Sequence, residues 1–123
     1  LVFEGCDSRK GEVFYRPLGG SIEYGERGVE AVKREFREEI SADLGEVIYL
    51  GMLENIYIYE GRRGHEIVLV YDGRLADERL YQNESIKGDE LGQSFTAVWK
   101  RLDEFGPGKS ILYPDGLLEL LRT

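Results

Sequence analysis

One stretch of the sequence, residues 19–42, constrains the fold more than any other. It opens on two consecutive glycines, which end the preceding strand and allow a close backbone approach. Beyond Gly28, apolar residues recur three, four and four positions apart, at Val29, Val32, Phe36 and Ile40. This spacing predicts a helix over residues 28–41 with one apolar stripe, which we expect to face a core.

The same predicted helix carries a concentration of carboxylates. Glu35, Glu38 and Glu39 stand at i, i+3 and i+4, so they share one face within about one turn. At about 100° per residue, this face lies roughly a quarter turn from the apolar stripe. Considered on the helix alone, a solvated acidic face paired with nearby basic residues explains the pattern. The alternative is a site for a hard divalent cation, foremost Mg²⁺, which prefers carboxylate oxygens.

The remaining segments predict a mixture of strands and short helices. Residues 1–5 and 12–16 are expected to form a hairpin, followed by a loop that ends near Arg27. Residues 46–60 and 65–75 are predicted as the long strands, joined by a turn at 61–64. The polar segment 76–93 is expected to be a long loop or irregular crossing. A strand over 94–102 and a closing helix that begins near Pro114 or Asp115 complete the prediction.

Size and charge bound the function. A chain of 123 residues with 41% hydrophobic content is expected to form one domain, over residues 1–123, although the strand-like start without Met leaves room for an incomplete first strand. The net charge of −8 argues against binding nucleic acid. The apolar runs are too short to span a membrane. The single cysteine, Cys6, is expected to be a small strand hydrophobe and fits a reducing, cytoplasmic compartment.

The residues around the acidic face match a known signature. Gly20, then Glu26 six positions later, then the run Arg34-Glu35-Phe36-Arg37-Glu38-Glu39 follow the spacing of the Nudix box, so the chain resembles the Nudix hydrolases. The wider stretch "PLGGSIEYGE" and Trp99 are also similar to members of that superfamily. Two positions depart from the pattern: Ser41 stands where the family usually has Gly, and Ala42 where it has a larger aliphatic residue. We expect Ser41 to lengthen or fray the last helical turn.

The resemblance implies a fold and a chemistry. The implied fold is an α/β/α sandwich with a mixed, curved central sheet. The implied reaction is Mg²⁺-dependent hydrolysis, with Mn²⁺ as a substitute, of the pyrophosphate bond in a nucleoside diphosphate linked to another moiety. The implied metal ligands are Glu35, Glu38 and Glu39, and one of them or a downstream carboxylate would act as general base. The resemblance further implies that Arg34 orients Glu35, that Glu26 supports the metal shell, and that the backbone carbonyl of Gly19 joins it, where a side chain would be unwelcome.

Several residues outside the box are weaker candidates. Three acids in the polar segment, Glu84, Asp89 and Glu90, lie where some Nudix enzymes carry an extra catalytic acid, and we choose Glu90 among them. His65, the only histidine, is either a structural residue at a hairpin end or a contact to substrate. Tyr57 and Tyr59 either pack within the sheet or stack on a nucleobase. Trp99 is expected to lie in the core or to form the wall of a cleft.

Two other classes of function compete with hydrolysis. The first is a non-catalytic Nudix-like module that binds a nucleotide as a sensor or regulator, and the second is a purely structural acidic domain. The complete set of Arg34, Glu35, Glu38 and Glu39 favours the enzyme, because a binding module has little need for it. The glycine pair counts against the structural domain. The predicted partner is a small nucleotide diphosphate, and a homodimer is left open.

Overall fold

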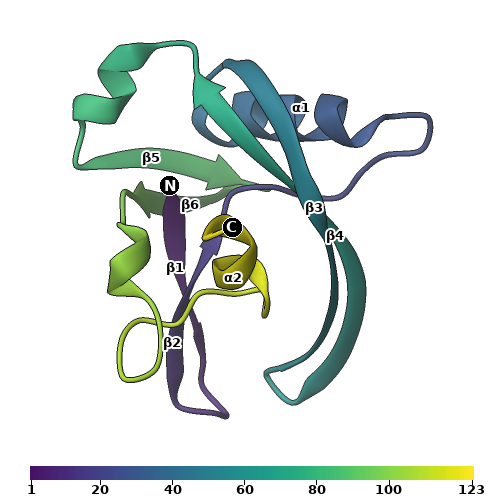
Figure 1. The fold of residues 1–123 in the computed structure, drawn as a ribbon, viewed down its shortest axis with the longest axis vertical. Coiled ribbons are helices and arrows are strands. Elements are labelled where there is room, and N and C mark those ends of the chain that lie inside the picture. The colour runs from purple at the N-terminus through teal and green to yellow at the C-terminus, as the bar shows by residue number, and fades with distance from the viewer.

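The computed structural model describes residues 1–123 and shows a small mixed α+β protein with antiparallel sheets and few helices (Figure 1). In chain order its strands and α-helices are β1 (Val2–Asp7), β2 (Glu12–Pro17), α1 (Gly28–Ile40), β3 (Leu44–Tyr59), β4 (Arg62–Leu75), β5 (Ser85–Glu90), β6 (Gln93–Val98) and α2 (Leu117–Leu121). Two 3-10 helices, η1 (Glu78–Gln82) and η2 (Leu102–Glu104), lie in the connections. Neither α-helix has the length and apolar character needed to cross a membrane.

The strands form two sheets rather than the predicted mixed one. Four of them pair in the order β2-β1-β6-β5, and the longer β3 and β4 form a separate two-stranded sheet. Every one of these pairings is antiparallel. Three pairs, β1–β2, β3–β4 and β5–β6, are joined by tight turns, and such turns impose antiparallel pairing, whereas parallel neighbours need a long crossover. The prediction of a mixed sheet is therefore corrected, and the α/β/α layering stays a prediction.

The β3–β4 hairpin curves away from α1, and its tip returns to the β1–β2 turn (Figure 1). There the Asp7 carboxylate accepts a hydrogen bond from the Glu60 backbone N–H at 3.0 Å, and Glu60 accepts bonds from Ser8. Helix α2 lies on the concave side of the hairpin, because Leu120 contacts the open position at Gly51 and Leu53 contacts Gly116. The hairpin is thus held at its tip and near its middle.

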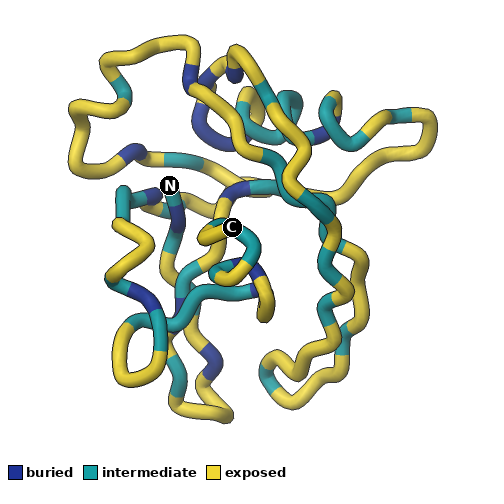
Figure 2. The backbone as a smooth tube through the Cα atoms, in the orientation of Figure 1, coloured by how far each residue is buried: buried dark blue, intermediate teal, exposed yellow.

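The core lies where the C-terminal end of α1 meets both sheets. Seven buried residues form it: Leu18, Ile40, Ala42, Leu44, Leu75, Ile86 and Ala97. Val32 and Phe36 pack against this cluster, so the predicted apolar stripe faces the core. Figure 2 shows the contrast with the lower part of the β3–β4 hairpin, which is largely exposed. The core therefore supports the helix face next to the carboxylates.

The polar segment 76–93 was the poorest prediction. It contains η1 and β5, and β6 begins at its last residue, Gln93. Side-chain contacts that leave no periodic pattern in the sequence hold this segment in place. The Tyr81 ring stacks on Trp99 at 5.0 Å, and the Tyr81 hydroxyl accepts a hydrogen bond from the Leu75 N–H at 2.9 Å. Three smaller corrections concern boundaries. Strand β6 ends at Val98 rather than at residue 102, and α2 begins at Leu117 rather than near Pro114 or Asp115. The β3–β4 turn is 60–61 rather than 61–64.

Helix α1 begins at the predicted residue, Gly28, but ends one residue earlier than predicted. Ser41 takes a left-handed conformation, with φ 54° and ψ 35°, and its N–H donates to the Arg37 carbonyl at 3.1 Å. The helix therefore stops at Ile40, and the expectation that Ser41 lengthens or frays the last turn was wrong. Ser41 adopts the conformation that Gly would adopt more easily.

Candidate functional site

Arg34 joins the loop after the glycine pair to the acidic face of α1. Its Nε and Nη2 donate to the two carboxylate oxygens of Glu26 at 2.7 and 2.9 Å. Its Nη1 reaches Glu35 at 2.9 Å and Glu38 at 3.1 Å. Nη2 also donates to the Ser21 carbonyl at 3.0 Å. One guanidinium thus fixes three carboxylates and one loop carbonyl, and the planar fork of Arg suits this task.

The Glu26–Arg34 pair is held in its charged form. The hydrogen bonds from Arg34, together with the backbone N–H of Glu23, lower the pKa of Glu26 to about 2. The same hydrogen bonds, with the nearby charges of Glu23 and Glu26, raise the pKa of Arg34 above its usual value. Both groups are therefore charged at neutral pH.

Glu39 is in the opposite situation. It is only 5% exposed, and its Oε1 has no hydrogen-bond partner in the protein. Burial, a hydrogen bond with Glu35 and the charges of Glu90, Glu35 and Glu38 raise the pKa of Glu39 to about 8. A buried carboxylate without a compensating partner is unfavourable. Strongly raised values of this kind gather at functional sites, because charge there serves a ligand rather than the fold.

The glycine pair serves this site through its second member. A Cβ at Gly20 would collide with the Glu35 carboxyl group, so the loop crosses directly over that side chain. A Cβ at Gly19 would meet nothing within 4 Å. The expectation that a side chain is unwelcome at Gly19 is therefore corrected to Gly20. The role of the Gly19 carbonyl is untouched by this and stays a prediction.

Strand β5 places one of the three candidate acids beside Glu39. A Cβ at Gly88 would lie 2.8 Å from the Glu39 backbone oxygen, so the strand runs directly against α1. Two residues further, Glu90 is close enough for its charge to raise the pKa of Glu39. Asp89 instead accepts the Gly92 N–H at 2.9 Å within the β5–β6 turn, and Glu84 is exposed before the strand begins. Of the three, Glu90 adjoins the cluster.

The carboxylates of this cluster are of the type that binds a divalent metal, although their side chains are not arranged around a common point. No group of three acidic, histidine or cysteine side chains is placed so that it could hold a metal ion. Glu35 and Glu38 point oxygens at Arg34. The unpartnered Glu39 Oε1 is, however, a free hard donor beside Glu35. A set made only of carboxylates suits Mg²⁺, which needs oxygen ligands and keeps several waters.

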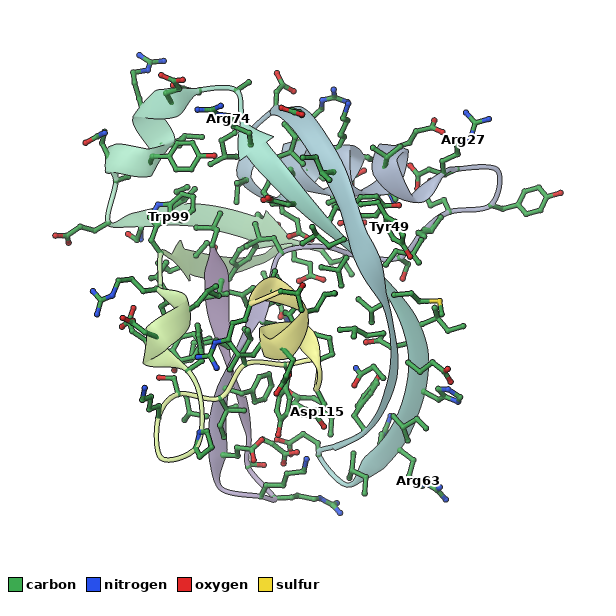
Figure 3. The ribbon with its side chains drawn as sticks, viewed as in Figure 1. Arg27, Tyr49, Arg63, Arg74, Trp99 and Asp115 are labelled. Atoms are coloured by element: carbon green, nitrogen blue, oxygen red, sulfur yellow. The ribbon has the colours of Figure 1, made fainter.

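The other candidates lie away from the carboxylates. His65 is exposed on β4, six residues and so about 20 Å along the strand from Tyr71, which packs under Gly28 at the start of α1. In Figure 3, Arg63 marks this far end of the hairpin and Arg27 the start of α1. Tyr59 packs edge-on against Phe14 at 6.2 Å, next to the same hairpin tip.

Two aromatic candidates are likewise engaged within the protein. The Tyr57 ring covers Gly64, where a Cβ would collide with it. Trp99 stacks on Tyr81 and packs against the core, as the prediction of a core residue requires. Cys6 lies in β1 as predicted, but its side chain is exposed rather than packed.

Sequence analysis missed two features of the site. The Ser21 carbonyl and Glu23, whose carboxylate is 3.7 Å from Arg34, complete the arginine's surroundings from the loop. Gly28 is needed because a Cβ there would collide with the Tyr71 hydroxyl. The absence of a side chain at Gly28 lets β4 approach the first turn of α1. The only available signal was a glycine at a helix start, where helix propensity disfavours it.

The comparisons with known proteins agree with this geometry. A family model described as NUDIX domain matches residues 5–117, a range that includes the glycine pair, α1 and the β5–β6 turn. The comparisons with curated proteins and with solved structures gave no match.

Proposed function

Because the chain belongs to the NUDIX domain family, we propose that it is a hydrolase that cleaves the pyrophosphate bond of a nucleoside diphosphate linked to another moiety, with Mg²⁺ as cofactor. Glu39 is the observation that carries this proposal. It is buried, one of its oxygens is unpartnered, and Glu35 and Glu90 lie beside it. A fold gains nothing from such a group, whereas a cation-dependent site needs it.

The proposed roles follow from the contacts. Glu35, Glu38 and Glu39, with the Gly19 carbonyl, would hold the metal, which when bound would neutralise phosphate charge and lower the pKa of a water. Arg34 keeps Glu35 in place through its fixed pair with Glu26. Only one carboxylate oxygen of Glu38 is bonded to Arg34 and the side chain is 58% exposed, so its other oxygen is free to bind a cation.

The reaction itself is an addition of water across the anhydride. The water oxygen forms a new bond to one phosphorus, the bond from that phosphorus to the bridging oxygen breaks, and a carboxylate takes the proton of the water. Glu39, with its raised pKa, and the neighbouring Glu90 are the two bases that the site offers. The products are two phosphate compounds, one of them a nucleoside monophosphate.

Charge limits the substrate to a small molecule. A chain with net charge −8 repels a polyanion beyond the immediate reach of a cation, so nucleic acid and capped RNA are disfavoured. Tyr49, which is exposed and packs against Tyr71 near the start of α1, offers a flat surface to a nucleobase. A homodimer remains a prediction.

Two measurements test the proposal. Hydrolysis is assayed over ADP-ribose, dinucleoside polyphosphates, nucleotide sugars, oxidised dNTPs, an isoprenoid diphosphate and a short capped RNA, with and without Mg²⁺. Thermal melts at millimolar Mg²⁺ and Mn²⁺ should show a raised Tm, because a ligand that binds only the folded state stabilises it. Binding of a nucleotide without turnover would favour the sensor instead. If the protein shows no hydrolysis and its Tm does not change with Mg²⁺ or Mn²⁺, the metal site itself is contradicted.

A further inference from the structure

Two hairpin turns of this protein share one backbone geometry. Glu60 and Gly61 join β3 to β4 with φ values of 50° and 76°, and Leu91 and Gly92 join β5 to β6 with 50° and 82°. Two central residues with positive φ match the twist of the flanking strands, and Asn-Gly or Asp-Gly is the usual choice. A residue with a Cβ is strained there, and neither Glu nor Leu is favoured.

The strain at Glu60 has a visible compensation. Its carboxylate accepts the Ser8 N–H at 2.6 Å and the Ser8 hydroxyl at 2.7 Å. Its own N–H donates to the buried Asp7 at 3.0 Å. Glu60 therefore stands at the turn because it ties the hairpin tip to the β1–β2 turn, a contact that Asn could not make in full.

Leu91 has no such compensation. Its side chain is 99% exposed, so an apolar group in a strained conformation contacts only water. The turn is braced without it, since Asp89 accepts the Gly92 N–H and Glu90 pairs with Gln93. The fold would be better served by Asn at this position. A strained backbone conformation that does not stabilise the fold, as at Leu91, points to a functional role.

The position of the β5–β6 turn indicates what this function is. Leu91 lies three residues beyond Gly88, where a Cβ would be 2.8 Å from the Glu39 backbone oxygen, and β5 packs against α1. The exposed side chain therefore stands at the rim of the carboxylate cluster. The cluster is entirely polar, so it can engage the diphosphate of a substrate but offers no apolar contact to the rest of the molecule.

We propose that Leu91 is a specificity-determining residue, which packs against the uncharged ring of the substrate when the diphosphate occupies the site formed by Glu35, Glu38 and Glu39. The inference rests on the proposed hydrolase function. It predicts that Leu91 contributes to binding of the substrate and not to the chemical step, since it carries no group that can move a proton or stabilise charge.

The test compares Leu91→Asn with Leu91→Met and with Glu60→Asn, the matched change at the other turn. With the substrate from the panel that the native enzyme turns over best, Leu91→Asn should raise KM about tenfold with kcat unchanged, the pattern of a lost binding contact. Leu91→Met should stay close to native KM. Glu60→Asn should leave KM unchanged and lower Tm, whereas Leu91→Asn should keep or raise Tm.

The outcomes separate this inference from the proposed function. If the native protein hydrolyses no member of the panel, the proposed function fails. If it does hydrolyse one and Leu91→Asn leaves KM unchanged, or lowers kcat alone, only the role of Leu91 is overturned. A change of oligomeric state in Leu91→Asn, seen by size-exclusion chromatography at unchanged KM, would place Leu91 in a protein interface and would also overturn it.

Discussion

Glu26 and Glu39 are two carboxylates of one acidic region with opposite surroundings. Glu26 receives two hydrogen bonds from Arg34, and its pKa falls to about 2. Glu39 is buried with an unpartnered oxygen, and its pKa rises to about 8. The first carboxylate is part of the scaffold that holds the loop on α1. The second has no cationic partner in the protein and leaves Oε1 without a hydrogen bond, and this difference separates a structural acid from one that is free for a ligand.

Glu38 lies between these two cases and gives the largest expected effect on activity. Glu38→Gln keeps the size and helix propensity of the side chain but removes a charged oxygen ligand. We expect turnover to fall by about a hundredfold or more, equivalent to roughly 2.7 kcal/mol of transition-state stabilisation. Stability should stay level, because the side chain is 58% exposed and its hydrogen bond is with Arg34, which keeps its other partners.

Glu30→Gln is the matched control for this change. Glu30 is an exposed acid of the same helix, and its carboxylate caps the first turn by accepting the Arg27 N–H at 3.2 Å. Glutamine can make the same bond, so both activity and Tm should be near native. Near-native turnover in Glu38→Gln would remove Glu38 from the active set.

The largest expected effect on stability tests the packing beneath both acids. Phe36 packs against the core from the apolar face of α1. Phe36→Ala should lower the free energy of unfolding by about 3 kcal/mol, at the lower end of the usual range because the ring is half-buried. Denaturant unfolding measures it, with Lys33→Ala on the same helix as the control. A midpoint unchanged from native would mean that the core does not support the acidic face.

The sequence predicted this helix well because its signals are periodic. The apolar stripe, the acidic face and the glycine pair each follow from spacing, and α1 begins at the predicted residue. Contacts between segments that are distant in the sequence leave no such periodic pattern. The Tyr81–Trp99 stack that orders residues 78–82, and the approach of Gly88 to Glu39, depend on how strands pair. The sequence could therefore name Glu90 as a candidate but could not show that it adjoins Glu39.

The pH dependence of stability distinguishes the two acids directly. In the metal-free protein, Glu39 binds its proton more tightly when folded than when unfolded, so stability should fall as pH rises from about 4.5 to about 8. Glu26 acts in the opposite sense: its contribution is present above about 4.5 and is lost as pH falls toward about 2. Glu39→Gln should remove the first slope, with a gain of about 1 to 2 kcal/mol at pH 9.

Urea unfolding from pH 5 to pH 9 in the presence of a chelator measures these slopes. Glu26→Gln is the control, because it should lower stability throughout this range and leave the slope between pH 5 and pH 8 in place. A Glu39→Gln variant that retains the native slope would show that Glu39 is not the group responsible, and the contrast between the two carboxylates would fail.

The smallest effect concerns the end of α1 just beyond Glu39. Ser41 is exposed and left-handed, with φ 54°, a conformation that glycine adopts without a Cβ penalty. Ser41→Gly should raise the free energy of unfolding by about 0.5 to 1 kcal/mol, the relief of strain being partly offset by the greater freedom of glycine in the unfolded chain.

Ala42→Gly is the control: Ala42 is buried in the core cluster and is not left-handed, so this change should be destabilising. Because Ser41 lies outside the carboxylate cluster, kcat should not change with the gain in stability. A Ser41→Gly protein that is no more stable than native would mean that the serine makes a compensating interaction at the helix end.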